Sequence, residues 1–142
     1  MSEENKAIVN RFYKEFANQG NLSVADELVA SDFVDHNPPS PDVAAGRDGV
    51  KQVFAMFRKA FPDMNMTVED QIAEGDKVVS RMKFQGTHKG EMMGIPSTGK
   101  KVSMGLIDIL RVKNGQITEH WGESDNLGMM QQLGVVPPPG ES

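Results

Sequence analysis

One carboxylate in the chain stands in a pattern that suits proton transfer. Residues 102–112 alternate as in a β-strand, which places four side chains on one face, those of Met104, Leu106, Asp108 and Leu110. Burial among apolar side chains disfavours the charged form of a carboxylate, and this is one way in which enzymes tune a general acid or base. Asp108 is therefore a candidate catalytic base. The alternative is a structural acid that binds a neighbouring histidine or a backbone amide.

The following segment, residues 116–123, supplies a histidine that could work with Asp108. Alternation separates its two faces, with Thr118, His120 and Gly122 on one and Ile117, Glu119 and Trp121 on the other. Either His120 or Trp121 therefore faces the same side as Asp108, unless a β-bulge intervenes. Histidine has a reference pKa near neutral, and we predict that His120 pairs with Asp108 to transfer protons. Trp121 is a candidate contact for a ligand, and the alternative for it is packing in the core or in a dimer interface.

Five other residues are candidate contacts for a ligand. His36 stands beside a proline-rich loop that could cover a pocket, but a surface histidine would give the same pattern. His88 shares a strand face with Met82, but a histidine at a strand end is more often structural. Phe57 lies on the apolar face of a helix, and Asp125 stands at the start of another. We expect all five near one cavity.

The sequence argues against several other chemistries. The chain has no cysteine, so thiolate metal sites, disulfides and cysteine nucleophiles are impossible. Its three histidines lie on different segments without HxH or HExxH spacing, which predicts that there is no metal site. Neither a GxGxxG nor a GxxxxGK(S/T) motif occurs, so we expect no nucleotide cofactor. Any catalysis should then rest on side chains alone.

The length and the charge of the chain limit its organisation and its partners. With 142 residues, of which 38% are hydrophobic, it fits one domain, which we place at residues 1–136 with a flexible tail at 137–142. Twenty acidic and fifteen basic residues give a net charge of -5, which disfavours nucleic acid as a partner. We find neither a run of ~20 apolar residues nor a signal peptide, and therefore expect no membrane span and a cytoplasmic location.

The elements that would position these residues fall into two halves. The first half contains helical spacing in residues 8–16, a short helix capped by Ser23, a loop at 37–47 and a helix at about 48–60. The second half contains strands at 64–73, 78–88, 102–112 and 116–123, and then a helix capped by Asp125. Asn114-Gly115 suits the tight turn between the last two strands. We expect the proline-rich loop to be mobile and to gate the cavity.

Helices followed by long antiparallel strands predict an α+β fold. We expect a cone-shaped α+β barrel, in which the N-terminal helices pack in the concave face of a curved, mostly antiparallel sheet and leave a cavity. The other face of the sheet would then need cover. We therefore predict a homodimer through apolar side chains on that face, namely Ile107, Ile109, Ile117 and Trp121.

Several motifs, in chain order, resemble the SnoaL-like polyketide cyclase or ester cyclase family. The resemblance covers residues 3 to about 136, and its motifs are Asp32-Phe33-Val34-Asp35-His36, Gly86-Thr87-His88, Gly90-Glu91-Met92-Met93-Gly94-Ile95-Pro96-Ser97-Thr98-Gly99, Ile107-Asp108-Ile109, Glu119-His120-Trp121 and Gln131-Gln132-Leu133-Gly134. The family belongs to the nuclear transport factor 2-like superfamily. Its α+β cone agrees with the fold expected from the pattern.

The resemblance implies an intramolecular aldol ring closure on a polyketide methyl ester, without a metal or an organic cofactor. In the family, the catalytic Asp lies two residues after the histidine of the last strand, and an inward histidine lies on the preceding strand. The matching positions here are Gly122 and Asp108. Either the acid has moved to the partner strand, or the aldol chemistry is absent.

Two functions therefore stay open. The first is a cofactor-independent cyclase, isomerase or related lyase that uses Asp108 and His120 on a small apolar carbonyl compound in a closed cavity. The second is a non-catalytic binding module of the same fold, whose cavity holds a hydrophobic small molecule. Two mutually bonded titratable groups inside the cavity would favour the enzyme, and a purely apolar cavity would favour the binding module.

Overall fold

A computed structural model describes residues 2–137 of the chain, and the predicted flexible tail lies outside this range except for Pro137. The elements in chain order are α1 (Ser2–Arg11), the π-helix η1 (Phe12–Asn18), α2 (Leu22–Leu28), β1 (Val29–Asp35), α3 (Gly46–Ala60), β2 (Asn65–Glu74), β3 (Lys77–Thr87), β4 (Lys101–Lys113), β5 (Gln116–Ser124) and α4 (Asn126–Leu133). The predicted helix–strand order is confirmed, except that β1 was not foreseen.

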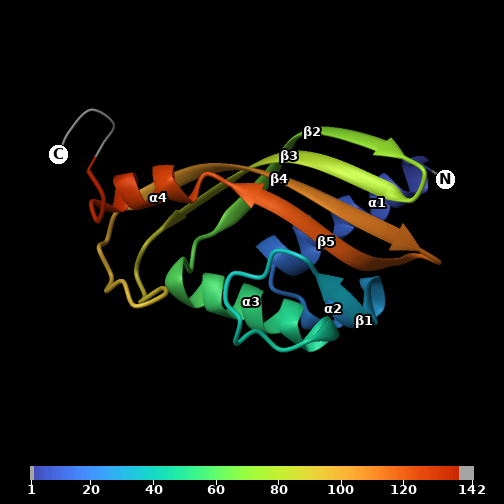
Figure 1. The fold of residues 1–142 in the computed structure, drawn as a ribbon, viewed down its shortest axis with the longest axis horizontal. Helices are drawn as coiled ribbons and strands as arrows, with labels where there is room; N and C mark the ends of the chain where they lie inside the picture. The colour runs from blue at the N-terminus through green and yellow to red at the C-terminus, as the bar shows by residue number, and fades with distance from the viewer. Residues whose placement is uncertain (1, 138–142) are drawn as a thin grey trace.

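The strands of the described residues form one curved sheet in the order β1-β5-β4-β3-β2. Neighbouring strands are antiparallel, except that β1 runs parallel to β5. Helices α1, α2 and α3 cover one face of the sheet, and α4 lies at its far end (Figure 1). The α+β architecture predicted from the sequence is confirmed, with a sheet that stays open between its edge strands β1 and β2.

The pairing of β3 with β4 forms the regular centre of the sheet. Lys77 pairs with Arg111 and Thr87 with Lys101, without a register shift between them. Alternate residues of β3 are buried beneath the helices, as the period of two requires. The turn from β4 to β5 has positive φ at both Asn114 (53°) and Gly115 (77°), as the Asn-Gly pair predicted.

A β-bulge at Thr118 changes which residues of β5 face the helices. Arg111 of β4 pairs with Glu119, but the next residue of β4 pairs with Ile117, so Thr118 is the extra residue. As a result, both Ile117 and His120 face the helices, and Ile117 is buried with 1% of its surface exposed. The sequence-based assignment of Ile117 to the outer face was wrong, because it assumed strict alternation.

The first helical segment buries the aromatic stripe that its spacing predicted. Phe12, Tyr13 and Phe16 all lie in η1 and are buried against the sheet and α3. The second helix begins differently from the prediction: its N-cap is Asn21, whose side chain accepts a hydrogen bond from the backbone N–H of Ser23. Ser23 therefore lies within the first turn. The predicted cap of α4 is confirmed, since the Asp125 carboxylate accepts from the Gly128 N–H at 2.8 Å.

Replacing Gly49 of α3 with alanine should destabilise the protein. Helix propensity alone would favour alanine by roughly 1 kcal/mol, but a Cβ at this position would lie 1.9 Å from the carbonyl oxygen of Ala44. Because that oxygen belongs to the backbone, we expect a net loss of about 2 kcal/mol or more, measured by chemical denaturation. Gly105→Ala is the control, because its Cβ would meet no atom within 4 Å. Wild-type stability for Gly49→Ala would contradict this packing.

Candidate active site

A cavity of about 540 Å³ lies between the helices and the concave face of the sheet. Most of its wall is apolar, and the lining residues include five phenylalanines and six methionines, Met64, Met66, Met93, Met104, Met129 and Met130. Several lining residues are also exposed to solvent, among them Pro38, Glu123 and Asn126. These residues mark the mouth of the cavity, and Pro38 places the proline-rich loop at that mouth.

A buried carboxylate, that of Asp108, projects into the cavity from β4. Its Oδ1 atom lies 2.8 Å from Nε2 of His120 on β5, and its Oδ2 atom accepts a hydrogen bond of 3.0 Å from the hydroxyl of Tyr13 on η1. Only 8% of the surface of Asp108 is exposed. Asp108 and His120, which the sequence suggested as a pair, are thus in direct contact, and Tyr13 completes the environment of the carboxylate.

The imidazole of His120 lies between two carboxylates. Its Nδ1 atom is 2.8 Å from Oδ1 of Asp35 on β1, on the side opposite Asp108. Burial lowers the pKa of His120, but the hydrogen bonds and charges of Asp108 and Asp35 outweigh this effect and raise its pKa to about 10. Burial alone would raise the pKa of Asp35, but its contacts with His120 and the Asn37 N–H lower it overall. At neutral pH the imidazolium can therefore donate one N–H hydrogen bond to each carboxylate.

Tyr13 is held as a neutral hydrogen-bond donor. Complete burial of the phenol, together with the charge and the hydrogen bond of Asp108, raises its pKa well above the usual value of 10.0. The phenol therefore stays protonated at neutral pH, and its O–H donates to Asp108. The carboxylate thus receives one donor from a cation and one from a neutral group.

Gly122 has no side chain, and this leaves room for the contact between Asp108 and His120. Asp108 and Gly122 are directly opposite each other in the β4–β5 ladder. A Cβ at position 122 would lie 2.7 Å from Oδ1 of Asp108 and 2.7 Å from Nε2 of His120. A side chain here would therefore push the two groups apart. The Gly122 N–H also donates to the side-chain oxygen of Asn37 at 2.9 Å, which ties the proline-rich loop to β5.

Trp121 and His36 lie together outside the cavity. Their rings stack on the outer side of the sheet, with centroids 4.7 Å apart and planes 8° from parallel. His36 Nε2 contacts Glu119 at 3.0 Å, and the cations of Lys77 and Arg111 lie over the indole ring. The structure therefore does not place either residue against a ligand in the cavity, because His120 and Trp121 are adjacent residues on opposite faces of β5.

The other suggested contacts divide in the same way. Phe57 lines the cavity, whereas Met82 is buried in the core beside it, with 1% of its surface exposed. His88 is completely buried, packs against Phe61 with the two rings tilted, and its Nδ1 lies 3.0 Å from the hydroxyl oxygen of Thr98. Asp125 is engaged as the cap of α4. Met82, His88 and Asp125 therefore contribute to packing and local structure. The sequence pattern could not separate these roles from ligand contacts, because strand faces, helix caps and ligand sites use the same residue types.

Sequence reasoning missed three residues of the site, Tyr13, Asp35 and Asn37. Tyr13 and Asp108 are 95 residues apart, and Asp35 and His120 are 85 residues apart. The Asp35-His36 motif did carry a signal, but its cavity residue is the carboxylate and not the histidine. Tyr13 gave no separate signal, because it lies in an aromatic stripe that any core helix could have.

Within residues 2–137, no group of three or more histidine and carboxylate side chains is arranged to hold a metal ion. None of the helices described is long and apolar enough to cross a membrane.

Comparisons with known proteins identify the family. Residues 7–133 match the SnoaL-like polyketide cyclase family, and the chain belongs to it. Nogalonic acid methyl ester cyclase from Streptomyces nogalater is 26% identical over 118 residues, which cover 82% of this chain and 88% of the relative. Aklanonic acid methyl ester cyclase DnrD from Streptomyces peucetius is 28% identical over 109 residues, which cover 76% and 72%.

Solved structures share the same fold over almost the whole chain. TsrD from Streptomyces laurentii superposes with a TM-score of 0.87 at 31% identity and covers 96% of this chain and 98% of its own. Wild-type IdmH from Streptomyces antibioticus gives a TM-score of 0.81 at 38% identity, with 92% and 99% coverage. The family resemblance inferred from the motifs is therefore confirmed.

The charge of His120 predicts a pH dependence of stability. A raised pKa stabilises the fold fully below the unfolded value of 6.5, and this contribution is lost as the pH rises towards about 10. Relative to His120→Gln, which cannot titrate, the wild-type protein should lose on the order of 3 kcal/mol of stability across this window. Denaturant titrations at several pH values measure it, and nitrogen NMR of the ring at pH 8 should report an imidazolium. A pH-independent difference would contradict the two-carboxylate arrangement.

Proposed function

We propose that this protein is a cofactor-independent polyketide cyclase that closes a ring by an intramolecular aldol reaction on an uncharged polyketide ester. Membership of the SnoaL-like family supports the class of reaction. An ester is proposed as the substrate because the relatives named above are cyclases of nogalonic and aklanonic acid methyl esters. The catalytic residues proposed are Asp108 as base, with His120 and Tyr13 as its hydrogen-bond partners.

The observation that carries this proposal is the position of Asp108 opposite Gly122. The family resemblance implies a catalytic Asp at position 122, and here that position has no side chain. The Asp108 carboxylate lies 2.7 Å from where a Cβ of residue 122 would be. An acid on the neighbouring strand therefore reaches the same part of the cavity, which supports a moved acid over a lost one.

The proposed reaction needs one proton acceptor and one proton donor. Asp108 takes a proton from a carbon that lies next to carbonyl groups, and the electron pair of that C–H bond forms an enolate. The enolate carbon attacks a second carbonyl carbon of the same molecule, so a C–C bond forms and the carbonyl oxygen becomes an alkoxide. The proton held by Asp108 returns to this oxygen. Substrate and product have the same atoms, and no external oxidant or reductant is required.

The partners of Asp108 fit this role. Two donors, the imidazolium of His120 and the phenol of Tyr13, hydrogen-bond to its carboxylate and hold it in place. A carboxylate is a weak base, so it is suited to a carbon acid that two carbonyl groups already activate, as in a polyketide. Asp35 keeps the imidazole charged and fixes its ring through Nδ1, so we propose it as a positioning residue.

The charge of the cavity wall supports an ester over a free acid. Among the lining residues that the structure describes there is no lysine or arginine, whereas Asp35, Asp108 and Glu123 carry carboxylates. An anionic substrate would lose its water shell and gain no cation except the already engaged His120. Esterification removes that charge, and the apolar wall then favours burial of the substrate.

The alternative function is a non-catalytic module that binds a hydrophobic small molecule. One observation favours it: both oxygens of Asp108 already accept a hydrogen bond from a side chain of the protein itself. The carboxylate could then hold the cavity together and merely orient a ligand. Each oxygen keeps a second lone pair, which is the acceptor that catalysis would use.

Replacing Asp108 by asparagine should separate the two functions. With a polyketide methyl ester and its free acid as substrates, we expect the wild-type protein to cyclise the ester in preference. Asp108→Asn and His120→Gln should each lower turnover about 100-fold or more, and the double variant should lose little further, because the residues act as one unit. Product is measured by chromatography. Glu119→Gln, which alters an outer residue of the same strand, is the control and should retain activity.

Two outcomes would change the assignment. Full activity of Asp108→Asn would remove Asp108 as the base, and Glu123, which flanks Gly122 and lines the cavity, would become the better candidate. If the wild-type protein bound the ester without turnover and Asp108→Asn bound it equally well, the binding module would be favoured instead.

We also propose that the protein is a homodimer that pairs through the outer face of the sheet. Ile107 is 48% exposed there, and Ile109 lies beside Trp121 in the β4–β5 ladder. Light scattering should give twice the 15.6 kDa mass of one chain, and the Ile107→Glu variant should give the mass of a single chain. A wild-type mass of a single chain at micromolar concentration would contradict this proposal. The cytoplasmic location stays a prediction from the sequence.

A further inference from the structure

A tight turn at Met93-Gly94 carries an unusual residue. The backbone N–H of Met92 donates to the carbonyl of Ile95, and the N–H of Ile95 donates back to Met92. Both central residues have positive φ, 48° at Met93 and 81° at Gly94. Two-residue turns of this kind favour asparagine, aspartate or glycine at the first central position, because other side chains are strained there.

The same chain contains the preferred version of this turn. Asn114-Gly115 joins β4 to β5 with φ angles of 53° and 77°, close to those of Met93-Gly94. At the β4–β5 turn the positive φ is therefore adopted by asparagine, which tolerates it, whereas at the other turn it is adopted by methionine. Within the described residues, Met93 and Asn114 are the non-glycine residues with positive φ. Backbone strain of this kind lowers stability, so a methionine kept at this position is expected to contribute to another property of the protein.

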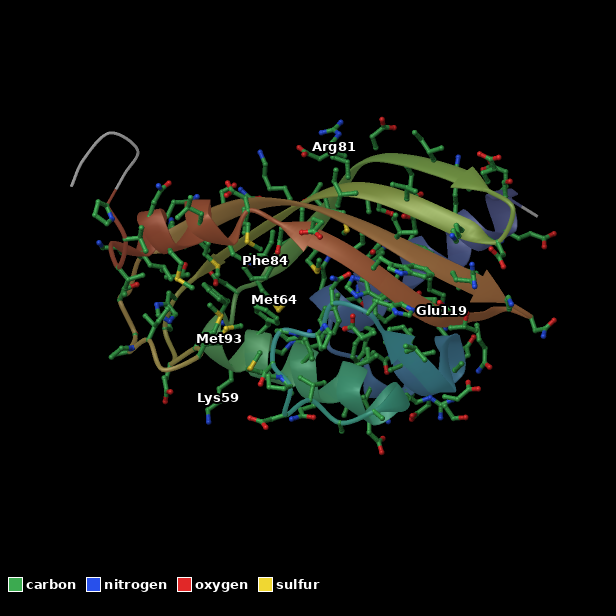
Figure 2. All side chains as sticks on the ribbon, in the orientation of Figure 1. Lys59, Met64, Arg81, Phe84, Met93 and Glu119 are labelled. Atoms are coloured by element: carbon green, nitrogen blue, oxygen red, sulfur yellow. The ribbon has the colours of Figure 1, made fainter. Side chains whose placement is uncertain are left out.

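The side chain of Met93 has a place in the cavity. It lines the cavity with Met64, Phe84 and Met104, although 51% of its surface is exposed. The connection that carries it is fixed to the end of α3, where the Gly90 N–H donates to the carbonyl of Ala60. Figure 2 shows Met93, Met64 and Phe84 close to this end of α3 and of the sheet. An exposed thioether is thus held at the apolar end.

This end of the cavity lies far from the proposed base. Along β4, Met104 precedes Asp108 by four residues on the same face, which corresponds to about 13 Å. A ligand that touches both Asp108 and Met93 must therefore be long as well as apolar. Methionine suits such a contact, since its flexible and polarisable side chain adapts to different apolar surfaces.

We propose that Met93 is a specificity-determining residue, which contacts the end of an uncharged, elongated apolar ligand remote from Asp108 and favours such ligands over shorter or polar ones. The proposal rests on the same cavity as the proposed function, but it requires binding and not turnover. If so, a substitution at position 93 that raises the stability of the fold should lower the affinity for the ligand. A residue that suits the turn should stabilise the free protein and weaken the complex.

The test uses three variants and the uncharged polycyclic dye Nile red as the probe, with its fluorescence reporting binding. Met93→Asn should raise the melting temperature by about 3 °C, since it relieves the turn. It should weaken dye binding roughly 3- to 10-fold, since the apolar contact is lost. Met93→Leu keeps an apolar side chain in the same strained turn and should retain both properties within about 2-fold and 1 °C.

Asn114→Met is the matched control. It places methionine in the same kind of turn away from the cavity, so the melting temperature should fall by about 3 °C without a change in dye binding. Unchanged binding by Met93→Asn, a lower melting temperature for it, or a wild-type protein that does not bind the dye would each overturn the proposal. Because the dye is not a substrate, an Asp108→Asn variant that has lost turnover should still bind it, which separates this inference from the proposed reaction.

Discussion

The site depends on the contact between Asp108 and His120. Two ionised groups away from bulk water carry a large desolvation cost, which only close pairing and further hydrogen bonds offset. Asp35 supplies the second carboxylate for the imidazolium, and Tyr13 supplies the second donor for Asp108. Both N–H groups of the imidazolium and both oxygens of Asp108 therefore have a hydrogen-bond partner. Four elements, η1, β1, β4 and β5, are thereby fixed around one charge cluster. The apolar cavity can contain this cluster because its members satisfy one another.

Two departures from regular strand structure make the contact possible. The bulge at Thr118 allows Ile117 and His120 to face the same side, so that β5 contributes both an apolar wall and an imidazole. Gly122 then leaves open the space directly across from Asp108. Together these features let an acid on β4 reach the region that the family motif assigns to an acid on β5. A regular strand with a side chain at 122 could not hold the same pair.

The cavity combines a polar site with a long apolar wall, and each part constrains the ligand differently. In the proposed function, the carboxylates and the imidazolium favour groups that exchange protons or hydrogen bonds, and they disfavour anions. The methionine-rich wall is proposed to select by length and by apolar area, with little demand on exact shape. In the Met93 turn, backbone conformation and cavity lining favour different residues, and the chain carries the residue that suits the cavity. Local rules are often broken in this way where a protein binds its ligand.

The sequence by itself determined the order of the helices and strands apart from β1, the inward face of β4 and the turn at Asn114-Gly115. Those features depend on periodicity and turn chemistry within about fifteen residues, which the chain displays directly. The family followed from short motifs spread along the chain. The sequence also brought Asp108 and His120 together, because they share one hairpin. Only the tertiary structure decided that Tyr13 and Asp35 complete the site, that Trp121 and His36 lie outside it, and that β1 joins β5 in parallel. These outcomes depend on contacts between residues more than 80 positions apart and on one bulge, and neither leaves a periodic mark in the sequence.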